Sequence, residues 1–131
     1  MKQFSDKEIS KISNSLKLNI FLEGNKFVVS DLKNYLDALK NFKYSFNPVQ
    51  ELGELRKSGP FKGKPSKFGM CWVEDISINQ LKRIGPIFKT YDVEKIIINV
   101  TKKSIKSQTC LYLDQELISV AAQINASIEI I

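Results

Sequence analysis

The segment LKLNIFLEG, residues 16–24, alternates apolar residues with others at a period of two. Leucine and isoleucine occupy the even positions from 16 to 22, and lysine, asparagine, phenylalanine and glutamate occupy the odd positions from 17 to 23. Successive side chains of a strand point to opposite faces, so this pattern predicts a half-buried strand. The Gly24-Asn25 pair that follows is typical of a turn.

Five further segments have the length and composition of strands. The last of them ends the chain, and we expect Ile128 and Ile130 to lie on its buried face. The five segments are residues 42–46, 68–75, 94–101, 109–113 and 126–131.

Four helices are predicted by apolar residues three or four positions apart, each behind a residue that can cap a helix. Ser77 and Gln80 have the form of a capping box, and Ser30 is a simple cap. The Gly85-Pro86 pair predicts either a kink or two short helices in its segment. The predicted helices cover residues 5–16, 30–39, 77–88 and 114–124, and each range begins with its capping residue.

These elements belong to the α+β class, with helices packed on one face of a sheet. From residue 68 onward they spell β-α-β-β-α-β, the order of a ferredoxin-like unit. Residues 16–101 spell the same order if the segment 42–46 is a strand, and element order alone does not choose between the two frames. We expect a ferredoxin-like sandwich with an N-terminal helix and an extra strand and helix, all within one domain of residues 1–131.

A long predicted loop, residues 47–67, concentrates positive charge. The whole chain has a formal charge of +6, from 20 lysine and arginine residues against 14 acidic ones. Residues 51–68 hold five cations and two anions, so a charge of +3 lies within one short segment. Phe61 stands among these cations and is expected to be exposed.

We predict that this loop is a binding element in which Phe61 is an anchor with a charged rim around it. The other interpretation, a solvated connection between two strands, stays open because loops of this length often have no further role. The predicted contact residues are Arg56, Lys57, Phe61, Lys62, Lys64, Lys67 and, in the strand that follows the loop, Trp72.

Residues that carry enzyme chemistry are scarce in this chain. It has no histidine, which is the commonest general base and metal ligand. Cys71 and Cys110 lie in predicted apolar strands, where we expect buried thiols that behave as small hydrophobic groups. The glycines match neither the P-loop nor the dinucleotide-binding pattern. We therefore expect no enzymatic activity, no cofactor and no metal site.

A module that binds RNA or single-stranded nucleic acid is an alternative prediction. Residues 20–25 and 67–73 loosely resemble the two ribonucleoprotein motifs of RNA-recognition domains. Phe21, Phe68 and Trp72 could then form a stacking face beside the basic loop. Lysine supplies 18 of the 20 cations, and the scarcity of arginine weakens any sequence-specific version of this interpretation.

Over roughly residues 16–131 the chain also resembles a widespread family of small bacterial domains of unassigned function. The resemblance is carried, in order, by LNIFLEG, DLKNYLDAL, Pro48, Gly53-Glu54, RKSGPFKGKPSK, Trp72 and CLYLDQELISVAAQINASIEII. Single-domain proteins of this kind are often encoded among bacterial toxin-immunity genes. The resemblance therefore implies an immunity-type protein that neutralises a cognate toxin domain by direct protein–protein contact.

The sequence predicts a cytoplasmic protein. Its first residues, MKQFSDKEIS, lack the apolar region of a signal peptide, and no apolar run approaches the ~20 residues that cross a bilayer. Two cysteines make no disulfide framework. A homodimer that pairs through an exposed strand edge stays open beside the toxin-binding and nucleic-acid-binding interpretations.

Overall fold

The computed structural model describes residues 17–100 and 110–130, which form a five-stranded mixed sheet with helices. The predicted α+β class is therefore confirmed, whereas the predicted helix at residues 5–16 lies outside the described residues. In chain order the elements are β1 (Leu18–Gly24), α2 (Val29–Asp37), β2 (Ser45–Gln50), β3 (Gly69–Ile76), α3 (Ile78–Ile84), the 3-10 helix η1 (Gly85–Tyr91), β4 (Lys95–Val100), α4 (Cys110–Ile124) and β5 (Ser127–Ile130).

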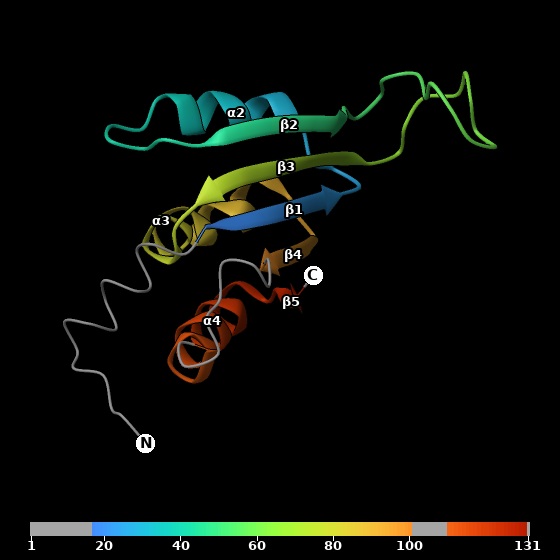
Figure 1. Cartoon of the computed structure of the whole chain (residues 1–131). Coiled ribbons are helices and arrows are strands. Elements are labelled where there is room, and N and C mark those ends of the chain that lie inside the picture. Colours follow the sequence, from blue (N-terminus) through green and yellow to red (C-terminus); the bar gives the residue numbers. More distant parts are fainter. Residues whose placement is uncertain (1–16, 101–109, 131) are drawn as a thin grey trace.

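The strands lie in the order β2-β3-β1-β4-β5, and Figure 1 shows the sheet they form. Neighbouring strands are antiparallel except β4 and β5, which are parallel. Parallel neighbours need a crossover connection, and α4 lies within this one. From β1 to β4 the element order is β-α-β-β-α-β, which is the order predicted for residues 16–101, and β5 extends the sheet beyond β4.

The predicted strand at residues 109–113 is wrong, because α4 already begins at Cys110. Leu117 and Val120 on this helix are buried at helical spacing. The same spacing extends back to Leu113, four positions before Leu117. The helical period therefore outweighs the short apolar run that indicated a strand. Without that strand, the frame that begins at residue 68 does not form.

The helices lie on one face of the sheet (Figure 1). The aliphatic side chains that the sheet directs toward them are buried in the core. On β1, Leu18, Ile20 and Leu22 are fully buried and the residues between them are half-buried, as the alternation predicts. The central strands β3 and β4 follow the same alternation. The sheet therefore has one core face and one face on which none of the described helices packs.

We call this second face the open face. Its members follow from the register, because directly opposed residues of neighbouring strands point to the same side. The open face consists of Asn19, Phe21 and Glu23 of β1, Ser45, Asn47 and Gln50 of β2, Met70, Trp72 and Glu74 of β3, Lys95, Ile97 and Asn99 of β4, and Ser127 and Glu129 of β5.

The helix starts agree with the sequence at α3 and differ at α2. The predicted capping box is present, since Ser77 Oγ accepts from the Gln80 N–H at 3.2 Å and Gln80 Oε1 accepts from the Ser77 N–H at 2.7 Å. Gly85 ends α3 and begins η1, so the predicted pair of short helices is confirmed. The N-cap residue of α2 is Val28, whose side chain makes no capping hydrogen bond, so the predicted cap at Ser30 is wrong.

Both edge strands depart from their predicted form. β2 continues through Pro48 to Gln50, so the loop begins at residue 51 and not at 47. Proline has no N–H, and an edge strand tolerates it because one side of the strand needs no partner. On β5, Ile128 is half-buried but Ile130 is 51% exposed, because this four-residue strand has a neighbour on one side only.

Candidate functional site

The segment between β2 and β3, residues 51–68, forms an irregular hairpin that we call the arm. Near its base, the Gly53 N–H donates to Ser66 O at 3.0 Å and the Ser66 N–H donates to Glu54 O at 2.8 Å. Further out, the Arg56 N–H donates to Lys64 O at 3.0 Å, and an isolated bridge pairs Leu55 with Pro65. The arm therefore has a backbone ladder of its own.

Three glycines let the arm turn. Gly53, Gly59 and Gly63 all have φ near +82°, a left-handed conformation that side chains disfavour. Gly63 also closes the tip, because its N–H donates to Arg56 O at 2.8 Å. The backbone geometry of the arm therefore accounts for these glycines.

Glu51 anchors the base of the arm to α2. Its Oε1 accepts from the Val29 N–H at 2.8 Å and from the Leu52 N–H at 3.0 Å, and its Oε2 accepts from the Ser30 N–H at 2.9 Å. The first N–H groups of a helix have no partner within it. A carboxylate at this end accepts hydrogen bonds from them and interacts favourably with the positive end of the helix dipole. The arm and the start of α2 are thus held as one unit.

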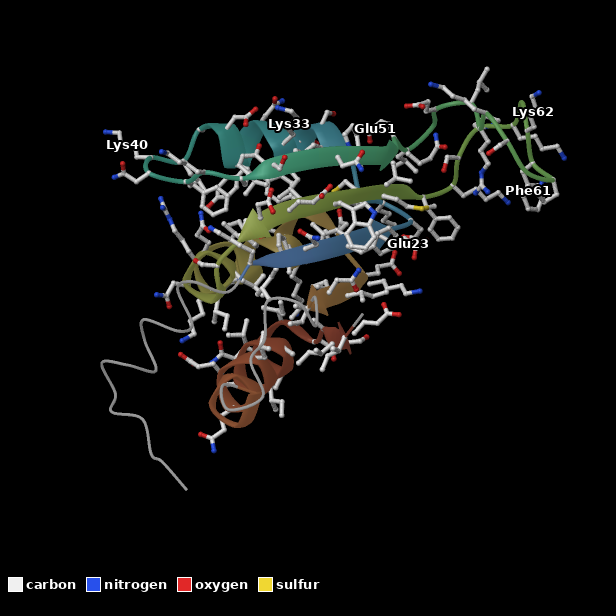
Figure 2. The ribbon with its side chains drawn as sticks, in the orientation of Figure 1. Glu23, Lys33, Lys40, Glu51, Phe61 and Lys62 are labelled. Atoms are coloured by element: carbon white, nitrogen blue, oxygen red, sulfur yellow. The ribbon has the colours of Figure 1, made fainter. Side chains whose placement is uncertain are left out.

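The tip of the arm presents an aromatic ring to solvent. Phe61 is 53% exposed, and the guanidinium carbon of Arg56 lies 5.3 Å from its ring centroid. Figure 2 shows Phe61 and Lys62 at the end of the arm, beyond the ends of β2 and β3, while Glu51 lies where the arm leaves the sheet. A hollow of about 300 Å³ is lined by Arg56, Phe61, Lys64, Pro65, Lys67 and Phe68.

Charge on the arm is of one sign beyond its base. Residues 55–67 contain five cations and no acidic residue. At the base, the carboxylate of Glu51 accepts hydrogen bonds from backbone N–H groups of α2 and the arm. The ion pairs within the described residues are Lys33–Asp37 and Lys82–Glu116, so neither neutralises a cation of the arm. The arm therefore carries positive charge that no described acidic side chain neutralises.

The structure brings together some of the predicted contact residues and separates others. Arg56, Phe61, Lys64 and Lys67 surround one hollow. Lys57 and Lys62 are exposed on the same arm but do not line the hollow. Trp72 lies in β3 on the open face, so it belongs to a different surface.

Sequence reasoning missed two apolar members of the arm surface and its anchor. Leu55 is 58% exposed and Phe68 is 38% exposed, which adds apolar area on either side of Phe61. For Leu55 the available signal was an apolar residue in a predicted loop, whereas Phe68 is the first residue of the predicted strand at residues 68–75. The anchoring role of Glu51 had no sequence signal, because the helix start that it caps lies more than 20 residues earlier in the chain.

Trp72 packs against Phe21 on the open face, with ring centroids 5.1 Å apart and ring planes inclined by 56°. Phe68, the third member of the predicted stacking face, lines the hollow of the arm instead. Among the described residues of the open face, the carboxylates of Glu23, Glu74 and Glu129 are accompanied by one cation, Lys95. The aromatic pair is therefore set among acidic groups.

A larger hollow, of about 590 Å³, lies at the other end of β2, and two of its lining side chains make hydrogen bonds within the protein. Gln80 Nε2 donates to Lys43 O at 2.8 Å, and the hydroxyl of Tyr44 donates to Asp37 at 2.6 Å. Its lining residues are Lys17, Asn41, Lys43, Tyr44, Ser45, Asp75 and Gln80.

The described residues offer no evident centre for catalysis or metal binding. Cys71 is fully buried, and this burial, together with the charge of Glu51, raises the pKa of its thiol to about 12. In residues 17–100 and 110–130, no three side chains of the histidine, cysteine, aspartate and glutamate types come together as metal ligands would. No helix within these ranges has both the length and the apolar character to cross a membrane.

Comparisons with known proteins do not place the chain in a family. No protein-family model matches it, and searches of curated proteins and of solved structures gave no match. The resemblance to the toxin-immunity-associated domains therefore stays a prediction from the sequence.

Proposed function

We propose that this protein binds a protein partner through the arm, residues 51–68. The observation that carries the proposal is the exposed ring of Phe61, held under Arg56 at the end of a hydrogen-bonded hairpin. Aromatic and arginine side chains dominate the energetics of protein interfaces. A ring that is already positioned loses less side-chain freedom on binding than a mobile one.

The partner presents an acidic face. Five cations of the arm lack acidic neighbours, and a complementary surface would speed the encounter and neutralise them. The exposed apolar side chains of Leu55, Phe61 and Phe68 then supply area to bury at the centre of the contact.

The electrostatics of the open face support a protein partner over a nucleic acid. Glu23 and Glu74 lie on the same face, two positions along the strand from Phe21 and Trp72, and carboxylates repel phosphate groups. A strand of RNA that stacked on Phe21 and Trp72 would have its backbone near these carboxylates. Positive charge is concentrated on the arm instead, on a different surface from the Phe21–Trp72 pair.

Within this proposal the protein is an immunity-type inhibitor of a cognate bacterial toxin, acting in the cytoplasm. The toxin assignment is supported by the sequence resemblance, whose basic segment, RKSGPFKGKPSK, coincides with the outer part of the arm. An inhibitor of this kind needs a binding surface and no catalytic group. A basic arm fits a toxin whose active or substrate-binding face is acidic.

The test is capture of the partner by the tagged full-length chain in its native host, after nuclease treatment. One variant replaces Lys57, Lys62, Lys64 and Lys67 by serine, and its matched control replaces Lys26, Lys40, Lys89 and Lys95, which are exposed elsewhere. We expect one protein to be captured by the wild type and the control and lost from the arm variant.

Expression of the captured protein alone should arrest bacterial growth, and co-expression of the wild-type chain should restore it. A captured protein that has no effect on growth would contradict the toxin assignment while leaving the arm as a binding surface. Capture that persists unchanged with the arm variant would contradict the proposed surface. Capture that nuclease abolishes would point to the nucleic-acid alternative.

A further inference from the structure

Four strands of the sheet place polar side chains around one small hollow on the open face. Its volume is about 230 Å³, and its lining residues are Asn19, Asn47, Trp72, Glu74 and Asn99. The register brings them together, because Asn47 lies opposite Trp72 and Asn19 lies opposite Asn99. We call it the open-face hollow. It is separate from the arm, so the inference drawn from it does not depend on the proposed function.

An irregularity in the β1–β3 pairing sets the shape of this hollow. The register shifts between Leu18 and Ile20, and Asp75 adopts a left-handed conformation with φ of +58°. The Asp75 N–H donates to Asn19 Oδ1 at 3.2 Å, which fixes the amide of Asn19. A β-bulge of this kind re-aims the side chains around it. Glu74 lies on the same face as Trp72 because it is two positions further along the strand, and the extra residue returns Ile76 to the core face.

The open-face hollow is rich in hydrogen-bond acceptors that are not in use. The Oδ1 atom of Asn99 is buried and has no hydrogen-bond partner among the described residues. Within the same part of the chain, the carboxylate of Glu74 makes neither an ion pair nor a hydrogen bond. Buried acceptors are ordinarily paired, so this arrangement indicates a donor that the described residues do not supply.

Charge, size and aromatic character together select the donor. Glu74 is the only charged residue among the described residues that line the hollow, and tryptophan is the aromatic side chain that attracts cations best. A volume of about 230 Å³ is below the ~300–1,000 Å³ of pockets for drug-sized ligands, so it suits one side chain. A guanidinium group offers planar donors to several acceptors at once, whereas an ammonium is a compact point charge.

We infer that the open-face hollow is a binding site for the guanidinium group of an arginine side chain presented by a protein partner. The guanidinium lies against the indole of Trp72 and donates to the carboxylate of Glu74. Asn47 and Asn99 supply further acceptors at the sides. The protein thus carries two surfaces of opposite electrostatic character, the basic arm and this acidic hollow.

Tryptophan fluorescence of the full-length chain tests the site directly, because Trp72 is the only tryptophan in the sequence. The probe is Nα-acetyl-L-arginine N-methylamide, titrated at constant ionic strength, with the corresponding lysine and citrulline compounds beside it. We expect a saturable change of emission with the arginine compound and a weaker response to lysine. The citrulline compound, which is neutral, should give no saturable change. Equal responses to arginine and citrulline would overturn the inference.

Two variants locate the response in the hollow. Glu74→Gln should weaken arginine binding by about tenfold or more, since it removes a charge-assisted hydrogen bond, and Asn47→Ala should weaken it less. Glu129→Gln lies on the same face outside the hollow and should leave binding unchanged. Equal binding by Glu74→Gln and the wild type would overturn the site.

A final comparison identifies the source of the guanidinium. Free arginine carries an α-ammonium and an α-carboxylate, which an arginine within a polypeptide lacks, so a site for a partner's side chain should bind it no more tightly than the blocked compound. Tighter binding of free arginine would overturn the assignment to a partner's side chain in favour of a small-molecule site. A saturable response to uridine monophosphate, without one to arginine, would overturn the inference in favour of nucleic acid.

Discussion

Arg56 lies over the ring of Phe61, with 5.3 Å between the guanidinium carbon and the ring centroid. The backbone brings the two together, because Gly63 and Lys64 hydrogen-bond to Arg56 across the hairpin and Phe61 lies within the turn that they close. An exposed cation–π contact contributes only about 0.5–1 kcal/mol. Its importance is that the aromatic ring and the charge next to it are positioned before any partner arrives.

The lysines of the arm should act mainly on the rate of association. Replacing Lys57, Lys62, Lys64 and Lys67 by serine removes long-range attraction but little buried contact, so the association rate constant should fall while dissociation changes less. The difference from wild type should shrink as salt is raised. Stopped-flow measurements with the captured partner at several salt concentrations check this. An unchanged association rate at low salt would show that the arm charges do not face the partner.

Glu51 should stabilise the fold through α2. Glu51→Gln replaces charge-assisted acceptors of three N–H groups by a neutral amide, and we expect a loss of about 1–2 kcal/mol in the free energy of unfolding. The matched control is Glu54→Gln, since Glu54 is exposed in the same arm. Urea denaturation of both variants gives the values. A Glu51→Gln chain as stable as the control would contradict the anchoring role.

Much of the sheet could be predicted from the sequence because its signal is local. The alternation in residues 16–24 and the capping box at Ser77 both depend on neighbours within a few positions, and both are confirmed. The segment at residues 109–113 was assigned to a strand because a short apolar run fits either a strand or a helix. The helical spacing of apolar residues that continues through residues 113–120 identifies this segment as the start of α4.

The arm surface was only partly predictable, since its residues are local but its anchor is not. Arg56, Phe61, Lys64 and Lys67 were found from charge and an exposed aromatic residue within one short segment. The capping of α2 by Glu51, and the open-face hollow, depend on pairing between distant strands and on the register shift in β1–β3. No pattern along the chain specifies that register.

Cys71 should resist thiol reagents in the folded protein. Burial raises the pKa of its thiol to about 12, from an ordinary value of 9.0, so almost no thiolate exists near pH 8. In a Cys110→Ser background, labelling by a disulfide reagent should proceed only as fast as the protein unfolds. Rapid labelling of the native chain at pH 8 would contradict this assignment.

The same raised pKa has a consequence for stability at high pH. Between about pH 9 and pH 12 the unfolded thiol loses its proton while the folded one keeps it. The free energy of unfolding should therefore fall as pH rises through this window. Relative to wild type, Cys71→Ala should show a flatter decline in denaturation experiments between pH 8 and pH 11. Parallel curves for the two proteins would contradict the raised pKa.

The contribution of Asp37 to the free energy of unfolding should decrease as the pH is lowered. Hydrogen bonds from Lys33 and Tyr44 lower the pKa of its carboxyl below 3.8. A lowered pKa in the folded state gives stability that is present above the ordinary pKa and is lost as pH falls through the folded one. The stability of Asp37→Asn should therefore approach that of wild type as pH falls through the lowered pKa of Asp37. Asp31→Asn, an exposed change in the same helix, serves as control.

The dissociation rate of the captured partner from Phe61→Ala tests the central claim, that the arm is the binding surface, most directly. The matched control is Ile118→Ala, which removes a side chain that is 60% exposed on α4, away from the arm. If Phe61 is the anchor, its loss should speed dissociation by about tenfold or more, which corresponds to at least ~1.4 kcal/mol, and the control should match wild type. Dissociation from Phe61→Ala at the wild-type rate would contradict the account.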